Sequence, residues 1–348
     1  MTTIPDIAKI AGVSNMTVSR VLNGNANYRR PAYARRAERI RRIADEMGYR
    51  PNSFARGVRS ARFGTFGLLL GTDPYRSALP LPMLGGVYKA LRERDLNLSM
   101  AMLPGNELAS PETAPKLLLE QMSDGLLIYY TDHLPDGMVE TIERVNLPAV
   151  WINTRLEKSC VYPADRDAGR TAAEHLLELG HTRIVFMDLA NSPDDPAIHY
   201  STIERFRGYS AAMEAAGLEP QLLWGRWPGV AGDDMATRVE AARRWLAADD
   251  RPTAVITLGQ SNSTPLFCAA GQLGLELPRD LSMITFDSSA LRIMGPRFTT
   301  MLIPQERVGA EAVALLDRMV AEPGSTPESV SVDFKFDPGE TCAPPRSR

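Results

Sequence analysis

The sequence predicts two parts of different fold class: an all-α helix-turn-helix head with a hinge helix, and a larger α/β body with parallel sheets in two subdomains. Three observations lead to this prediction. The 348 residues are too many for one ordinary core, so several domains are expected. Residues 1–62 hold 13 Lys and Arg against 4 Asp and Glu, whereas the rest of the chain holds 26 against 38. From Phe63 onward, short apolar runs alternate with amphipathic segments, as in crossover units of parallel sheets.

The uneven charge is more informative than the net charge of −3. A basic segment joined to an acidic body is typical of a protein whose one end meets a polyanion. A basic surface that is merely solvated gives the same pattern, so charge alone leaves both interpretations open.

Two short helices are predicted at the start of the head. Thr3 begins the first, with Asp6 three residues later as in a capping box. Gly12 then permits a tight turn. Ser14 is placed to cap a second helix over Asn15–Asn23, which ends before a glycine.

The second helix has an apolar face and a polar face. A helix, a glycine-containing turn and a second helix with a polar outer face form the geometry that enters the DNA major groove, although such pairs also occur in proteins that never bind DNA. On the DNA interpretation, the base-reading side chains are those at the start of the helix, together with Arg20, which can reach a guanine or a phosphate. The DNA-contact candidates in the head are Thr3, Ser14, Asn15, Met16, Thr17, Ser19, Arg20, Asn23, Tyr28 and Arg29.

A third amphipathic helix is predicted over residues 32–47. Ile40, Ile43 and Ala44 lie on its apolar face, and arginines cover the rest. Arg outnumbers Lys twelve to one in residues 1–62. This preference suits the fork-like contacts that guanidinium groups make with phosphates.

Three motifs follow one another in the head: A-K-x-A-G-V-S, T-V-S-R-V-L-N and G-Y-R-P-N. With them, residues 3 to about 337 resemble the lactose–galactose repressor family of bacterial regulators. The runs EHLLELGHTRIVF, ERFRGYSAAM and GLELPRDLSMITFDSS extend the resemblance through the body. The resemblance implies a body like a type I periplasmic binding protein, a homodimer on pseudo-palindromic double-stranded operator DNA, and a small-molecule effector.

The predicted boundaries are a DNA-binding head at 1–50, a hinge at 51–62, an effector-binding and dimerisation body at 63–340 and a tail at 341–348. Within the body, the first subdomain takes about 63–160 and 305–322, and the second takes about 161–304 and 323–340. The predicted strands are 66–70, 96–102, 125–130, 149–153, 184–188, 254–258 and 282–286. The predicted helices are 83–94, 115–122, 137–145, 169–179, 205–216, 233–247 and 265–273.

The hinge departs from the family pattern. In the family this segment folds on DNA and pushes a leucine into the minor groove, a wedge that bends the duplex. Here the matching residue is Val58, preceded by Gly57, which costs a helix about 1 kcal/mol relative to alanine. We therefore expect a hinge whose order depends more on DNA; a plain flexible linker is the alternative. The hinge candidates for DNA contact are Asn52, Ala55 and Val58. A second departure is a head longer by about four residues, which we place in the loop 25–31.

Effector candidates follow from motif matches and from the ends of predicted strands, where ligands bind in such folds. Arg205, in an R-x-x-G-Y frame, and Asp287, in an I-T-F-D frame, match family residues that contact effectors. For Arg205 the alternative is a surface salt bridge, for Asp287 a turn, and for each aromatic candidate ordinary packing. Gly259 to Asn262 replace the usual Asn-Asp, so the effector can differ from a plain hexose. The candidates are Asp73, Tyr75, Tyr130, Asn153, Arg205, Trp227, Gln260 and Asp287.

Catalytic, metal and membrane signals are missing from the sequence. It has no G-x-S-x-G, H-E-x-x-H, Walker or G-x-G-x-x-G motif, so we expect no enzyme, metal or cofactor; an enzyme of the same layered architecture is the remaining alternative. The three cysteines are far apart, no signal peptide precedes the head and no apolar run could span a membrane. These features predict a cytoplasmic protein without a membrane partner.

The functional hypothesis is an effector-responsive, sequence-specific repressor of carbohydrate-utilisation genes. The alternative is a regulator that uses a nucleobase or another non-sugar metabolite as corepressor. The chain ends in TCAPPRSR without a heptad helix, so we expect a dimer and not a tetramer held by its tail.

Overall fold

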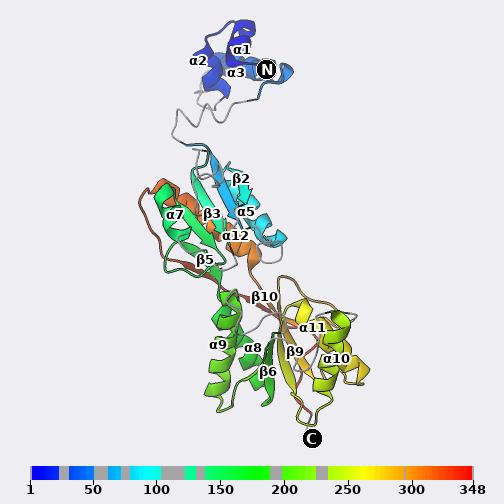
Figure 1. Cartoon of the computed structure of the whole chain (residues 1–348). Coiled ribbons are helices and arrows are strands. Elements are labelled where there is room, and N and C mark those ends of the chain that lie inside the picture. Colours follow the sequence, from blue (N-terminus) through cyan, green and yellow to red (C-terminus); the bar gives the residue numbers. More distant parts are fainter. Residues whose placement is uncertain are drawn as a thin grey trace. The chain divides into compact units, whose positions relative to one another are not determined.

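The computed structural model describes residues 2–22, 31–50, 62–71, 79–102, 122–130, 138–188, 198–224, 234–293 and 295–346. The chain divides into two compact units, Met1–Phe63 and Gly64–Arg348 (Figure 1). The predicted fold class is confirmed: the first unit is an all-α head and the second is an α/β body with two mostly parallel sheets. The predicted hinge helix lies outside the described residues.

Three helices form the head: α1 (Ile4–Ala11), α2 (Asn15–Leu22) and α3 (Pro31–Glu46). Ile7, Val18 and Ile40 contribute one fully buried side chain from each helix. These apolar positions recur at helical spacing, which explains why each helix buries one face in a shared core.

The turn between α1 and α2 has the predicted local chemistry. The Asp6 carboxylate accepts hydrogen bonds from the Thr3 backbone N–H at 2.9 Å and from the Thr3 hydroxyl. Gly12 takes a left-handed conformation with φ +66°, which glycine adopts without steric cost. The Ser14 hydroxyl accepts from the Thr17 backbone N–H at 3.2 Å and so caps α2.

The first sheet of the body has the order β11-β5-β4-β3-β1-β2, and its strands are parallel. Its strands are β1 (Thr65–Leu70), β2 (Asn97–Met102), β3 (Gly125–Tyr129), β4 (Ala149–Ile152), β5 (Cys160–Pro163) and β11 (Val330–Val332). The helices of this subdomain are α5 (Leu81–Glu93), α7 (Met138–Val145) and α12 (Gln305–Ala321).

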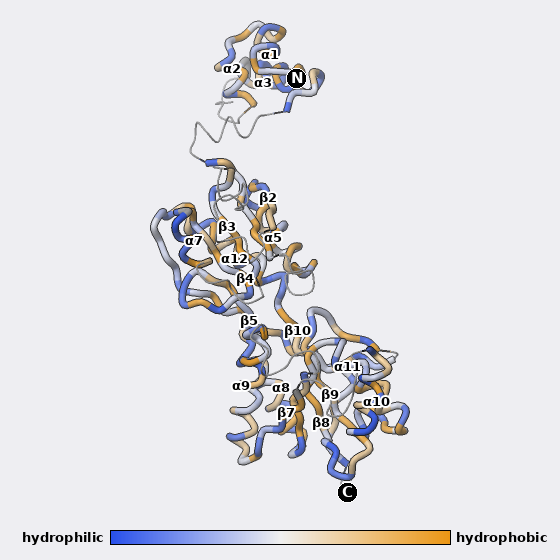
Figure 2. Tube along the Cα trace, in the orientation of Figure 1, coloured by the Kyte–Doolittle hydropathy of each residue, from blue (hydrophilic) through white to orange (hydrophobic). Residues whose placement is uncertain are grey.

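The second sheet has the order β12-β10-β9-β8-β6-β7, with β12 antiparallel to β10. Its strands are β6 (Ile184–Asp188), β7 (Gln221–Trp224), β8 (Ala254–Leu258), β9 (Ser282–Asp287), β10 (Thr299–Leu302) and β12 (Lys335–Asp337). Its helices are α8 (Asp165–Glu178), α9 (Tyr200–Ala215), α10 (Met235–Leu246) and α11 (Gln260–Gln272). Apolar residues follow β8 and β9 along their length (Figure 2), as expected for strands covered on both faces.

The chain passes between the two sheets three times. It leaves β5 at Pro163 for α8, returns from β10 at Leu302 to α12, and crosses again between β11 and β12. Residues 160–163 and 330–332 therefore belong to the first sheet, whereas the predicted subdomain boundaries assigned 161–163 and 330–332 to the second subdomain. Short strands at a sheet edge carry too little apolar pattern to be assigned from sequence.

Several elements start earlier than the sequence suggested. Helices α8, α9 and α11 begin at Asp165, Tyr200 and Gln260, four to five residues before the predicted starts. The first turns of these helices are rich in polar residues and carry no apolar repeat that marks a helix start. Strands β5, β7, β10, β11 and β12 and helix α12 were not predicted. Most of the predicted helix 115–122 lies outside the described residues.

Two close helix pairs stabilise the body. In the second subdomain, Gly169 of α8 and Gly208 of α9 each face the backbone of the other helix, so that an added Cβ would overlap a carbonyl oxygen. In the first, Gly86 of α5 and Gly309 of α12 make the same kind of approach.

Within the described residues, no helix has both the length and the apolar character to cross a membrane.

Candidate DNA-binding and effector sites

Helix α2 presents a row of exposed side chains opposite its buried face. Val18 and Val21 pack into the head core. Asn15, Met16 and Arg20 are exposed, and Met16 is 63 % accessible. This polar face with one apolar side chain is free of contacts with the head core and can meet another molecule.

Three of the other described head candidates, Thr3, Ser14 and Thr17, make hydrogen bonds at the start of their own helix. The Ser14 and Thr17 hydroxyls lie 2.9 Å apart and share a hydrogen bond, and Thr17 and Ser19 are half-buried. Thr3 is exposed and bonded to Asp6, so its described role is capping. Their contacts with DNA stay predictions. The predicted site residues that lie outside the described part of the chain are Asn23, Tyr28, Arg29, Asn52, Ala55, Val58, Asp73, Tyr75 and Trp227.

Arg205 forms the centre of the candidate effector site. Its Nε donates to Asp165 Oδ1 at 2.8 Å, and the two side chains are 11 % and 1 % exposed. Its guanidinium lies over the rings of Phe286 and Phe334, 4.7 and 5.5 Å from their centroids. Two aromatic faces and a carboxylate hold the guanidinium plane. Within the described residues, the terminal nitrogens Nη1 and Nη2 make no hydrogen bond and are available to a ligand.

Asp165 is a carboxylate in an unusual environment. Burial raises the pKa of Asp165, while the neighbouring Arg205 opposes the shift. Its Oδ2 is buried and, within the described residues, accepts no hydrogen bond. A side-chain hydrogen bond from Tyr200 also opposes the rise in the pKa of Asp165.

Asn153, at the carboxyl end of β4, connects the two subdomains. Its φ of +56° is left-handed, a conformation that asparagine tolerates better than most residues. The His199 Nε2–H donates to the Asn153 carbonyl at 3.0 Å, and the Tyr200 hydroxyl donates to Asn153 Oδ1 at 3.3 Å. An ion pair of 2.6 Å between Arg155 and Glu204 adds a charged contact beside them.

The proton on His199 follows from its partners. Nδ1 accepts from the Ser201 backbone N–H, and a carbonyl can only accept, so the ring proton is on Nε2. Burial lowers the pKa of His199 to about 4, and the Asn153 carbonyl only partly opposes this shift. The ring is therefore neutral at pH 7 and caps the start of α9.

The remaining candidates divide between the site and the core. Asp287 is the last residue of β9, and Gln260 follows the neighbouring strand β8 at the same end of the sheet; Gln260 is exposed. The Asp287 carboxylate accepts from the Ser288 backbone N–H at 2.7 Å, as a turn-forming residue does. Tyr130 is buried in the core cluster of the first subdomain, which fits ordinary packing.

Asp165, His199, Tyr200 and Glu204 were missed by the sequence prediction. All four lie within the first five residues of α8 or α9 or at the N-cap of α9. The sequence does carry one signal for these residues. Polar residues stand at the starts of helices that follow the ends of strands, and ligands bind at such positions in these folds.

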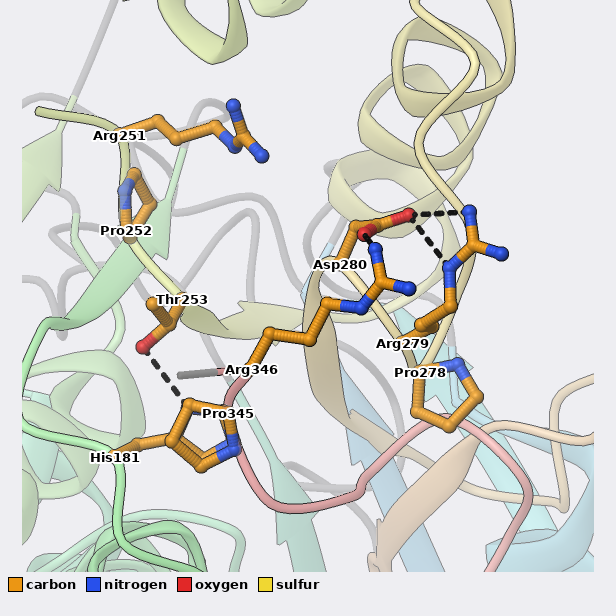
Figure 3. A pocket seen from close by; sticks show the side chains of 9 residues that line it. All are labelled: His181, Arg251, Pro252, Thr253, Pro278, Arg279, Asp280, Pro345 and Arg346. Carbon is orange, nitrogen blue, oxygen red and sulfur yellow. Dashed lines mark hydrogen bonds and ion pairs between the residues drawn. The ribbon is translucent and has the colours of Figure 1, made fainter. Parts of the chain in front are cut away.

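A separate hollow lies at the amino ends of the strands of the second sheet (Figure 3). Asp280 accepts from Arg279 and from Arg346, each at 3.1 Å, and Arg251 stands apart from them. His181 also lines this hollow, and its Nε2–H donates to the Ala343 carbonyl at 2.9 Å. These contacts fasten residues 343–346 to the second sheet, so we interpret this hollow as an anchor for the chain end.

Acid should weaken the body through His199. Its pKa is about 4 in the folded protein and about 6.5 in an unfolded chain. Because the folded value is the lower one, stability is complete above pH 6.5 and falls as the pH drops toward 4. We expect a loss of about 2 kcal/mol between pH 7.5 and 5, measured by urea unfolding.

The matched variant is His199→Asn, which can still cap α9 but does not titrate. Burial also lowers the pKa of His175 and His181, so part of the loss should remain in this variant. An identical pH dependence in the two proteins would contradict the assignment to His199.

Comparison with known proteins gives consistent matches over both units. The description "Bacterial regulatory proteins, lacI family" matches residues 3–52, and "Periplasmic binding protein-like domain" matches residues 173–342. The "HTH-type transcriptional repressor PurR" of Photobacterium profundum is 27% identical and covers 92% of this chain and 93% of its own. The "Ribose operon repressor" of Escherichia coli K12 is 28% identical, with 93% and 94% covered. A lac repressor dimer bound to operator shares the fold, with TM-score 0.77, 20% identity and coverage of 98% and 99%.

Proposed function

The chain belongs to the lacI family of bacterial regulatory proteins, and from that premise we propose that it binds a pseudo-palindromic operator as a homodimer and represses carbohydrate-utilisation genes until an effector changes its DNA affinity. The relatives are named as transcriptional repressors, and this protein is a DNA-binding regulator and not an enzyme. The single observation that carries the operator proposal is the exposed row of Asn15, Met16 and Arg20 on α2. Side chains at the start of such a helix read base edges in the major groove.

Exposed apolar side chains in the first subdomain support a homodimer. Leu81 and Tyr88 on α5 are 81 % and 62 % exposed, and Met100 and Met102 on the edge strand β2 are also exposed. Apolar residues at this density on one helix and on an edge strand mark a protein interface. Light scattering should give twice the chain mass of 38.3 kDa; a tetramer would contradict the proposal.

The effector proposal rests on the polar groups around Arg205. Within the described residues, two guanidinium nitrogens of Arg205 make no hydrogen bond, Asp165 Oδ2 accepts none, and the Asn153 amide is bonded to the neighbouring Tyr200. These groups suit a ligand rich in hydroxyls, such as a sugar. A second candidate, a nucleobase or another non-sugar metabolite as corepressor, is kept because the relatives include the repressor PurR as well as the ribose operon repressor. Titration calorimetry against sugars and nucleobases distinguishes the two.

Selection from random double-stranded DNA tests the function directly. The full chain should enrich a pseudo-palindromic sequence, and a sugar effector should release it, whereas a nucleobase corepressor should tighten binding. The chain without residues 1–61 is the control, because the body is a compact unit by itself. If that shortened protein bound the selected DNA with full affinity, the head would not be the DNA reader.

Arg20→Ala should weaken operator binding by about 1–3 kcal/mol if the guanidinium makes a bidentate contact with a guanine. On DNA in which the base pair of that guanine is changed, Arg20→Ala should weaken binding much less, because the contact with guanine is then already missing. Fluorescence anisotropy at fixed salt measures both. Lys9→Ala removes an exposed charge from α1 and serves as control; an equal loss in the two variants would indicate a nonspecific charge effect.

A further inference from the structure

The hollow at the amino ends of the strands of the second sheet contains a guanidinium group without a counter-charge (Figure 3). Arg251 lines this hollow and is half-buried. Within the described residues, its side chain makes no ion pair and no hydrogen bond. In Figure 3, Arg251 and Arg279 stand on opposite sides of the hollow. Because a partly buried charge is costly without a partner, this position favours an anion.

The other charged groups around the hollow neutralise one another. Arg279 forms an ion pair of 2.7 Å with Glu276, and Arg346 forms one of 3.1 Å with Asp280. Both carboxylate oxygens of Asp280 are in use, since Oδ1 accepts from Arg346 and Oδ2 accepts from Arg279. In the part of the chain that the structure describes, Arg251 is therefore the positive charge of this hollow that no carboxylate meets.

Proline rings form part of the wall of the hollow. Pro252, Pro278 and Pro345 line it, and a proline has no N–H that could donate to a ligand. The volume of the hollow is about 190 Å³, which is below the roughly 300–1,000 Å³ of sites for drug-sized ligands. A ligand that fits these walls is small and combines an anionic group with a short apolar part.

The hollow is separate from the candidate effector site. Thr253, which lines the hollow, directly precedes β8, whereas Gln260 follows the opposite end of that strand. At about 3.3 Å per residue, the five residues of β8 span about 16 Å. One small ligand cannot reach both places, so a ligand in the hollow would be a second one.

We propose that this hollow binds a small organic carboxylate, whose two oxygens accept from the Arg251 guanidinium and whose apolar part packs against the three prolines. A guanidinium fork matches the geometry of a carboxylate, and hydrogen bonds between charged groups are stronger than those between neutral groups. Pro345 and Arg346 belong to the segment 343–346 that is fastened to the second sheet. A bound carboxylate would join this segment to Arg251 and stabilise it on the body.

The test is urea unfolding of the full chain with butyrate as the probe, at constant ionic strength with chloride as the replaced anion. Tryptophan fluorescence follows the body, which contains all four tryptophans. The unfolding midpoint of the wild type should rise with butyrate and follow a Kd on the order of 1 mM. Arg251→Gln should not show this rise. Arg251→Lys should show a smaller rise, because it keeps the charge but loses the fork.

Arg292→Gln is the matched control, because Arg292 is exposed in the same subdomain and does not line the hollow. It should respond to butyrate as the wild type does. Inorganic phosphate is the second probe, and it should bind about tenfold more weakly, because it has no apolar part to bury.

Hydrogen exchange locates the bound butyrate without any variant. In the wild type, butyrate should slow the exchange of backbone amides in residues 341–346. The proposal is overturned if these amides do not respond, or if Arg251→Gln gains as much stability from butyrate as the wild type. Phosphate that binds as tightly as butyrate overturns the assignment to an organic carboxylate. The regulator function does not depend on any of these results, since the hollow lies outside both the head and the candidate effector site.

Discussion

Replacing Arg205 with alanine should lower the free energy of unfolding by about 3–5 kcal/mol and abolish the response to effector. The guanidinium is the ion-pair partner of Asp165, whose side chain is 1 % exposed. Without it, the carboxylate must either stay charged in the core or take up a proton, and burial already raises its pKa. Because protonation relieves the buried charge, the loss of stability should shrink as the pH is lowered.

Urea unfolding followed by tryptophan fluorescence measures this loss cleanly. All four tryptophans lie in the body, so the signal reports the unit that contains Arg205 and not the head. The double variant Asp165→Leu/Arg205→Met removes both charges and should regain most of the stability but none of the effector response. If Arg205→Ala alone had the stability of the wild type, the Arg205–Asp165 pair would contribute little to the stability of the folded state.

Gly208→Ala should destabilise the body by about 3 kcal/mol, at the upper end of the cost of overpacking. An alanine Cβ would overlap the carbonyl oxygen of Arg166 and come within 2.8 Å of the Arg170 backbone nitrogen. Both atoms belong to the α8 backbone, so no side chain can move to make room. Helices α8 and α9 would have to separate, and the Arg205–Asp165 contact between them would lengthen.

Gly271→Ala is the matched control for this substitution. Gly271 lies in α11 of the same subdomain, and no atom lies within 4 Å of its would-be Cβ. There, alanine should stabilise the helix by about 0.5–1 kcal/mol. A Gly208→Ala protein as stable as wild type, with an unchanged effector affinity, would contradict the close approach of the two helices.

The predictions from sequence were most accurate where contacts between neighbouring residues determine the local structure. The Thr3–Asp6 start, the Gly12 turn and the Ser14 cap each involve residues at most three apart, and the structure confirms all three. The alternation of strands and helices was equally readable, because each strand between covered faces is an apolar run.

The candidate site was predicted less completely, because its contacts join distant residues. Arg205 was found through its motif, but its partner Asp165 lies forty residues away, and His199 meets Asn153 across forty-six. No local pattern encodes such pairs. Tyr130 was a candidate that the structure places in a core. In sequence, an aromatic residue at the end of a strand looks the same whether it packs in a core or faces a ligand.

The three passages between the sheets limit how the body can be recombined with a relative. Neither subdomain is one continuous stretch, because β11 and α12 return to the first sheet after the second is nearly complete. A chimera that exchanges the second subdomain therefore needs three junctions, near 164, 303 and 334. A single-junction exchange near 164 would join β11 of one parent to β5 of the other, and α12 of one parent to Gly86 of the other. The second subdomain of this protein is thus transferable only as a set of two segments, 164–303 and 334–348.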